Sequence, residues 1–136
     1  MKPIILPWPP WQLSGHTGVH WRAKATLTKK HREWARLATL EAGVKAPQGE
    51  GDIYLRVLFI PPDRRSDRTN FANRLKPAFD GIADALGVND RRFVPSYHFA
   101  EPEKPGRVEI TLCAIPWTQA DETHLSAAER YLARAA

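Results

Sequence analysis

A group of polar side chains in one short part of the sequence could act together on a phosphodiester. Hydrolysis of that bond needs a cation that polarises a phosphoryl oxygen and activates water, and Mg²⁺ prefers carboxylate oxygens as ligands. A lysine beside the carboxylates can neutralise the charge that develops on the phosphate. The residues with these properties are Asp67, Asn70, Lys76, Asp80, Asp84 and Asp90.

The spacing of these residues places part of the group on one helix face. Apolar residues recur every three or four positions from 70 to 86, which predicts an amphipathic helix with one buried face. Lys76, Asp80 and Asp84 follow each other at intervals of four and therefore share a face. An ordinary solvated helix has the same spacing, so a metal site and a plain surface both stay open. Pro77 predicts a kink or two abutting segments.

Two of the carboxylates lie outside this predicted helix. Asp67 belongs to the charged loop 63–70, which follows a strand, and Asp90 comes after the helix. Functional groups are often carried by such loops. Folding could bring both side chains to the helix face or leave them apart, and the sequence leaves this open.

The remaining pattern predicts an α+β fold, with helices packed on a small mixed or antiparallel sheet. Residues 4–6 lie between prolines and are expected to form an edge strand. Residues 53–59 alternate as a strand buried mainly on one face. Residues 93–99 and 108–115 are expected to pair as a hairpin through the turn 102–106.

Capping residues indicate two further helices. Thr28 can cap a helix that runs to about residue 42, where Gly43 is a stop signal. A last helix is expected near the end of the chain. The predicted order is strand, helix, strand, helix, strand, strand, helix. We expect a single domain of residues 1–116 with a helical extension of residues 117–136.

The charge balance favours a polyanionic partner. Lysine and arginine number 20 against 15 aspartates and glutamates, and the excess lies mainly in residues 22–30 and 64–76. A positive surface attracts phosphates because binding releases condensed counterions, which makes DNA a natural partner. The residues that we expect to contact the DNA backbone are Lys29, Lys30, Arg64, Arg65, Arg68, Arg74 and Arg91.

Other features exclude several classes of protein. The single cysteine, Cys113, rules out an intrachain disulfide and is expected to be a small buried side chain. The five histidines have no zinc-type spacing. No stretch reaches the roughly 18 to 20 apolar residues that cross a bilayer, and no signal-peptide core is present. We therefore expect a cytoplasmic protein with no membrane partner.

Several segments resemble the RusA family of Holliday-junction resolvases. The central motif of that family is similar to Asp67-Arg68-Thr69-Asn70, to residues 75–85 and to Asn89-Asp90-Arg91. Further similarity lies in residues 6–10, 20–23 and 107–110, so that the resemblance covers roughly residues 4 to 114. It implies a dimeric, Mg²⁺-dependent endodeoxyribonuclease that cuts four-way DNA junctions and is often encoded by phages or prophages.

The resemblance also implies roles for single residues. Asp67 matches the first acidic ligand, Asn70 the motif asparagine and Lys76 the essential lysine. Asp80 matches the helix aspartate, and Asp90 matches the first member of an aspartate pair. The implied catalytic residues are therefore Asp67, Asn70, Lys76 and Asp90, and the implied Mg²⁺ ligands are Asp67, Asp80 and Asp90.

The sequence departs from the family at two acidic positions. Thr69 replaces an aspartate, and Arg91 replaces the second member of the pair; a gap-free register would instead place Asn70 and Ala72 on acidic positions. An active endonuclease and a branched-DNA binder without cleavage both stay open. A structural or partner-binding domain is a third possibility, but it leaves the resemblance unexplained.

Overall fold

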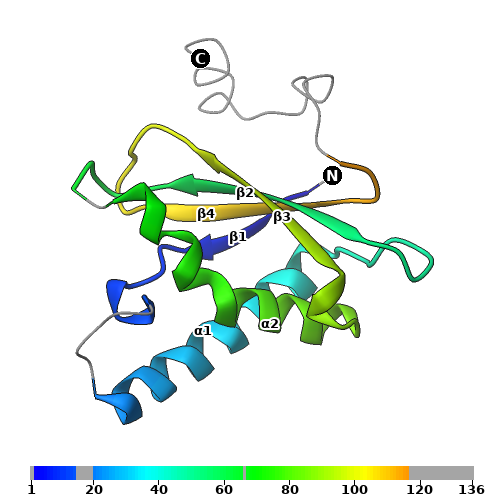
Figure 1. Cartoon of the computed structure of the whole chain (residues 1–136), viewed down its shortest axis with the longest axis horizontal. Coiled ribbons are helices and arrows are strands. Elements are labelled where there is room, and N and C mark those ends of the chain that lie inside the picture. The colour runs from blue at the N-terminus through cyan, green and yellow to red at the C-terminus, as the bar shows by residue number, and fades with distance from the viewer. Residues whose placement is uncertain (1, 15–19, 66, 117–136) are drawn as a thin grey trace.

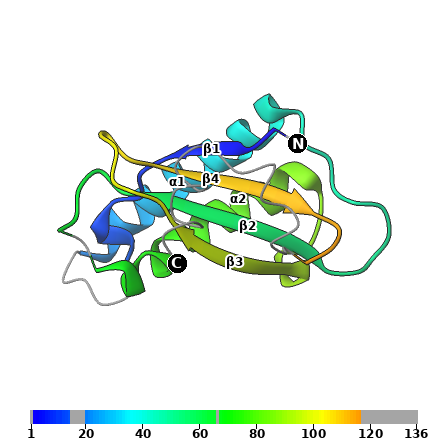
Figure 2. The ribbon, with the colours of Figure 1, turned by 90° about the horizontal axis from the view of Figure 1, so that it is seen from above.

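The computed structural model describes residues 2–14, 20–65 and 67–116. Four strands form one mixed sheet in the order β1-β4-β2-β3 (Figure 2). They are β1 (Ile4–Pro7), β2 (Ile53–Ile60), β3 (Phe93–Phe99) and β4 (Arg107–Cys113). Strand β4 lies antiparallel between β1 and β2, whereas β3 runs parallel to β2. The expected edge strand at residues 4–6 is confirmed.

Two helices, α1 (Trp21–Ala42) and α2 (Lys76–Leu86), lie on the same face of the sheet (Figure 1). The main core lies between the helices and the sheet, and it includes Ile53, Leu55, Val57 and Phe59 of β2. The α+β fold with helices packed on a small mixed sheet is therefore confirmed. The predicted C-terminal helix falls in residues 117–136, which lie outside the described residues.

Helix α1 begins earlier than the sequence predicted. Its N-cap is His20, whose Nδ1 accepts a hydrogen bond from the backbone N–H of Arg22 at 3.2 Å. The predicted cap at Thr28 is wrong, because Thr28 lies inside the helix. Histidine is a less usual cap than threonine. The predicted end is confirmed, since Gly43 follows with a φ of 68°.

The predicted hairpin of β3 and β4 is wrong. The two strands lie on opposite sides of β2, so β2 hydrogen-bonds to both and occupies the inner position. The connection after β3 crosses the end of β2, where the N–H groups of Ala100 and Glu103 donate to the carbonyls of Phe59 and Pro61. Strands β3 and β4 are consecutive in the sequence but form no hairpin, because the more apolar strand β2 lies between them in the sheet.

Strand β2 is also buried on both faces rather than mainly on one. Leu58 and Ile60 pack with Ala100 in a second apolar cluster, separate from the main core. Residues of β2 therefore pack in two apolar clusters, one of them the main core beneath the helices. Cys113, at the end of β4, is partly exposed, so the expectation of a buried thiol is wrong.

Pro77 lies in the first turn of α2, directly after a 3₁₀ segment at Ala72–Leu75. Of the two predicted outcomes, two abutting segments are therefore observed. Proline is tolerated in a first helical turn because its missing N–H would have no intrahelical partner there.

Helices α1 and α2 approach each other very closely at Gly81. A Cβ atom on Gly81 would lie 2.1 Å from the backbone oxygen of Arg32 and 2.9 Å from the Cβ of Ala35. Only glycine permits this backbone contact. The crossing brings polar side chains of α1 next to those of α2, which builds the site described below.

Within the described ranges, no helix is both long and apolar enough to cross a membrane.

Candidate functional site

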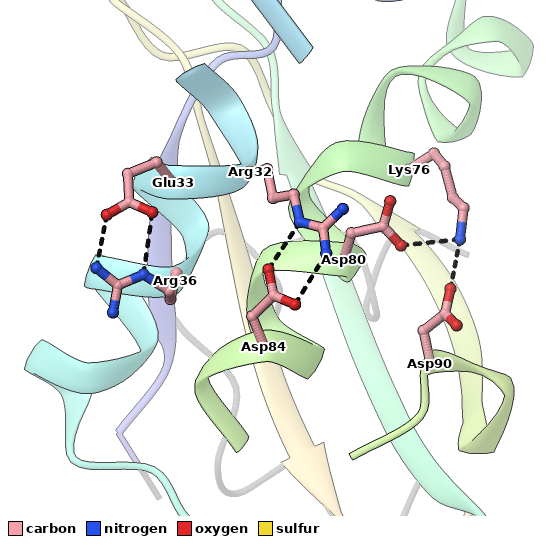
Figure 3. A network of polar contacts seen from close by, with 7 residues as sticks. All are labelled: Arg32, Glu33, Arg36, Lys76, Asp80, Asp84 and Asp90. Atoms are coloured by element: carbon pink, nitrogen blue, oxygen red, sulfur yellow. Dashed lines mark hydrogen bonds and ion pairs between the residues drawn. The ribbon is translucent and has the colours of Figure 1, made fainter. Parts of the chain in front are cut away.

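One lysine links two of the predicted site carboxylates. Lys76, the first residue of α2, donates from Nζ to Asp80 Oδ1 at 2.9 Å and also to the carboxylate of Asp90 (Figure 3). Asp80 lies one turn further along α2, and Asp90 begins the 3₁₀ turn Asp90–Arg92. We call Lys76, Asp80 and Asp90 the polar centre. It contains three residues for which the sequence predicted catalytic or metal-binding roles.

The local fold explains why Asp90 reaches the helix. Helix α2 ends at Leu86, and Gly87 adopts a φ of 68°, which turns the chain back. Asn89 then caps the 3₁₀ turn by accepting a hydrogen bond from the N–H of Arg91 at 2.9 Å. The contact between Lys76 and Asp80 follows from their spacing of four, but the contact to Asp90 depends on this reversal.

The polar centre is charged and open to water. Hydrogen bonds to Asp90 and to Asp80 raise the pKa of Lys76, and the Lys76 ammonium lowers the pKa of Asp90. The Lys76 side chain is 66% exposed, whereas those of Asp80 and Asp90 are partly covered. These shifts favour the charged forms of Lys76 and Asp90, and a phosphate or a cation can reach the polar centre from solvent.

A second ion pair lies beside the polar centre. Arg32 of α1 binds Asp84 of α2 through two hydrogen bonds, from Nε at 2.7 Å and from Nη2 at 2.9 Å. These bonds raise the pKa of Arg32. The charges of nearby Asp80 and Asp90 raise it further, by a smaller amount. Arg32 thus connects the polar centre to α1 (Figure 3).

Arg32 was not among the predicted site residues. Arg32 lies within the helix that was predicted to run to about residue 42, and nothing in the sequence indicated which helix its side chain would face. A signal was present in Gly81, because a glycine inside an amphipathic helix pattern often marks a close approach of backbones. Its close contact with the Arg32 backbone brings α1 against α2.

Asp67 and Asn70 form a separate local structure. Asp67 caps the 3₁₀ turn Arg68–Asn70 by accepting hydrogen bonds from the Thr69 backbone N–H at 3.0 Å and from its hydroxyl at 2.9 Å. These two bonds lower the pKa of Asp67. Asn70 is exposed, and its backbone N–H bonds the carbonyl of Asp67. Thr69 thus donates to the carboxylate beside it.

The described residues contain no cluster of three or more histidine, cysteine, aspartate or glutamate side chains that could hold a metal ion. Asp67 therefore does not join Asp80 and Asp90 in one such cluster. The two carboxylates of the polar centre still fit Mg²⁺ chemically, because this cation is often held by one or two carboxylates together with substrate phosphates and water. In the structure, the Lys76 ammonium lies between these two carboxylates.

The cationic residues predicted to contact DNA differ in their surroundings. Arg65, Arg68 and Arg91 are exposed, and the Arg68 guanidinium lies 5.8 Å from the centre of the Phe99 ring. Arg64 forms an ion pair with Glu101. These residues lie on loops and 3₁₀ turns before and after α2, so their charges are accessible.

The two predicted lysines of α1 are also exposed. Lys29 lines an open hollow on the helix surface. The Lys30 ammonium lies 4.6 Å from the centre of the Trp34 ring. Both charges can meet a phosphate.

Arg74 is different, because its side chain belongs to the interior. Arg74 is only 8% exposed, and its guanidinium donates to Ser14 Oγ at 3.2 Å and to the carbonyl of Pro9 at 3.3 Å. Burial lowers its pKa. The residue ties the N-terminal segment to the segment before α2, so we do not include it in the proposed DNA-binding surface.

No protein-family model matches the chain. It is 40% identical over 121 residues to an uncharacterized protein of Xylella fastidiosa (strain Temecula1 / ATCC 700964), a match that covers 85% of this chain and 78% of that protein. The chain belongs to the same family as this Xylella protein. Family membership brings no activity with it, because the relative is itself uncharacterized.

Proposed function

We propose that this protein is a Mg²⁺-dependent, structure-selective endodeoxyribonuclease that resolves four-way DNA junctions. The observation that carries the proposal is the polar centre, in which an exposed lysine lies between two aspartates on a basic protein. The resemblance of the surrounding motif to RusA-type resolvases supports the same reaction. We further propose that the protein works in the cytoplasm as a homodimer, which would supply two centres for two opposing strands.

In this proposal Asp80 and Asp90 hold the cation and Lys76 contacts the phosphate. Bound Mg²⁺ would polarise a phosphoryl oxygen and make a water molecule more acidic. Lys76 leaves its aspartate partners and then neutralises negative charge on the phosphate. The solvent exposure of the Lys76 side chain allows this movement. Arg91, the residue after Asp90, is exposed, and in this proposal it binds the DNA backbone next to the reacting phosphate.

A second candidate function is branched-DNA binding without cleavage. It is favoured by the fact that four of the predicted site carboxylates already have partners inside the protein. Lys76 bonds both Asp80 and Asp90, Asp84 has Arg32, and Asp67 accepts two bonds from Thr69. Under this alternative the polar centre stabilises the fold between α2 and the turn at Asp90, and the arginines bind phosphates.

A cleavage and binding assay separates the two candidates. The wild-type protein is incubated with a labelled synthetic four-way junction and with a linear duplex of matched sequence, each with and without Mg²⁺. Metal-dependent paired nicks near the branch point of the junction alone support the endonuclease. Tight junction binding without nicks under all conditions supports the second candidate. If the protein binds neither DNA at low salt, both candidates are wrong.

A further inference from the structure

The first turn of α1 presents a large aromatic side chain to solvent. Trp21 is 67% exposed, more than any other tryptophan among the described residues. On its N-terminal side the His20 ring is stacked with it, with centroids 5.8 Å apart and planes at 28°. The Arg22 guanidinium lies 5.2 Å from the centre of the indole. An exposed indole flanked by an imidazole ring and a guanidinium is suited to bind a flat aromatic group such as a base.

An open hollow of about 470 Å³ extends from Trp21 along α1. It is lined by Trp21, Lys24, Ala25, Thr28, Lys29 and Arg32, so that its charged lining residues are all cations.

The hollow leads toward the polar centre. Arg32, which lines the hollow, binds Asp84 and lies near Asp80 and Asp90. A strand of nucleic acid that passes the polar centre can therefore continue along α1 past Lys29 to Trp21. The two surfaces belong to one face of the α1–α2 pair.

The chemistry of this surface matches a nucleotide whose base is unpaired. Aromatic side chains bind single-stranded nucleic acid by stacking on bases, while cations beside them follow the phosphates. A fully paired duplex keeps its bases stacked inside the helix and offers Trp21 no free base face. A branch point or a single strand does offer one.

We propose that Trp21 is a stacking platform for an unpaired base of branched DNA, with Lys24 and Lys29 binding the adjacent phosphates. This inference rests on the proposed DNA-binding function and adds a residue that would distinguish branched from linear DNA. Lys24 also donates to the carbonyl of Ser14 at 3.2 Å, which holds its ammonium near the hollow.

The test measures the affinity of Trp21→Ala for three labelled DNAs: a single strand, a four-way junction and a blunt duplex. Stacking on one base predicts that the variant loses about 5- to 150-fold in affinity for the single strand, with a loss on the junction as well. Its affinity for the duplex stays within about twofold. Trp21→Phe keeps most of the affinity because it keeps an aromatic face.

Trp11→Ala is the matched control, because Trp11 is 56% exposed but does not line the hollow. This variant should bind all three DNAs like the wild type. Replacement of a branch-point adenine by 2-aminopurine adds a direct readout of stacking. The wild type should quench its fluorescence, and Trp21→Ala should not.

The outcomes separate this inference from the proposed function. If the wild type binds none of the DNAs, the proposed function fails and the inference fails with it. If the wild type binds DNA but Trp21→Ala binds the single strand and junction equally well, only the stacking role is wrong. An equal loss on duplex, junction and single strand also overturns it, since general damage to the protein or a contact between protomers would explain that result.

Discussion

The polar centre and the hollow on α1 are neighbouring surfaces that differ in their balance of positive and negative charges. In the polar centre, the Lys76 ammonium is held by Asp80 and Asp90, so one positive charge faces two negative charges. In the hollow, the charged lining residues are Lys24, Lys29 and Arg32, and no carboxylate lines it. The first surface must release an internal partner before it binds another group. In the second, Arg32 is paired with Asp84, but Lys29 is exposed, has no ion pair among the described residues and can attract an anion directly.

This difference assigns separate tasks to the two surfaces. Lys29 and the exposed Arg65 and Arg91 are suited to affinity, because none of them has to leave an ion pair among the described residues before it binds a phosphate. The polar centre is suited to a step that exchanges partners, in which a phosphate or a cation replaces an ion pair. Changes in the hollow should therefore alter binding, whereas changes in the polar centre should alter cleavage.

The largest effect is expected at Gly81, on which both surfaces depend. The added methyl group of Gly81→Ala would overlap the backbone oxygen of Arg32, so α1 and α2 must separate. Overpacking of this kind costs about 1 to 3 kcal/mol or more, which corresponds to a fall in melting temperature of roughly 4 to 12 °C. Thermal unfolding followed by circular dichroism measures it.

Gly51→Ala is the control for Gly81→Ala. No atom lies within 4 Å of the Cβ position at Gly51. Its melting temperature should change by no more than about 2 °C, as expected for a surface substitution. Equal stability of the two alanine variants would contradict the tight helix crossing.

A buried arginine and an exposed one should separate stability from binding. Arg74→Gln leaves Ser14 and the carbonyl of Pro9 without their charged donor, so we expect a loss of about 1 to 3 kcal/mol in the free energy of unfolding. Arg65→Gln should leave stability unchanged and weaken binding to every DNA. Urea unfolding and DNA titration measure the two quantities.

The salt dependence of DNA binding sharpens this contrast. Loss of one phosphate contact in Arg65→Gln should lower the slope of log affinity against log salt by about one. The Arg74→Gln protein that remains folded should keep the wild-type slope. A reduced slope in Arg74→Gln with unchanged stability would mean that Arg74 belongs to the DNA-binding surface.

The smallest effect is expected for the ion pair between Arg32 and Asp84. Both side chains are substantially exposed, so Asp84→Asn should cost less than about 1 kcal/mol at neutral pH. The hydrogen bond from Arg32 lowers the pKa of Asp84 in the folded protein. The stabilisation is therefore complete above the ordinary aspartate pKa of about 3.9 and is lost as the pH falls through the lowered value.

Stability curves of the wild type and Asp84→Asn should accordingly converge in acid. The difference between their free energies of unfolding should be constant from pH 5 to 8 and should shrink as the pH falls below the ordinary aspartate pKa of about 3.9. A difference that grows in acid would contradict a lowered pKa for Asp84.

Local patterns predicted much of the fold, but long-range pairing decided the rest. The apolar spacing of residues 70–86 indicated α2 and its polar face, and Gly43 indicated the end of α1. The partners of β3 and β4 could not be read from their own sequences, since their positions depend on β2 having an apolar surface on both faces. The early start of α1 was missed because His20 is a less usual cap.

The candidate site shows the same limit. Spacing alone predicted that Lys76 and Asp80 share a face, and the resemblance added Asp90. The contact between Lys76 and Asp90 needs the chain reversal at Gly87, and the pair of Arg32 with Asp84 needs the helix crossing at Gly81. Burial of Arg74 was equally hidden, because its partners lie 60 or more positions away in the chain.

The most direct test of the account compares junction cleavage by the wild type with that by Asp90→Asn, with Asp84→Asn as a control. Asp90→Asn should reduce Mg²⁺-dependent nicking at least about 100-fold, the size of effect expected when a group that acts in the reaction is lost, and should keep junction binding. Asp84→Asn, which changes the neighbouring carboxylate paired with Arg32, should cleave like the wild type. Equal cleavage by Asp90→Asn and the wild type would contradict the assignment of the polar centre as the reactive site.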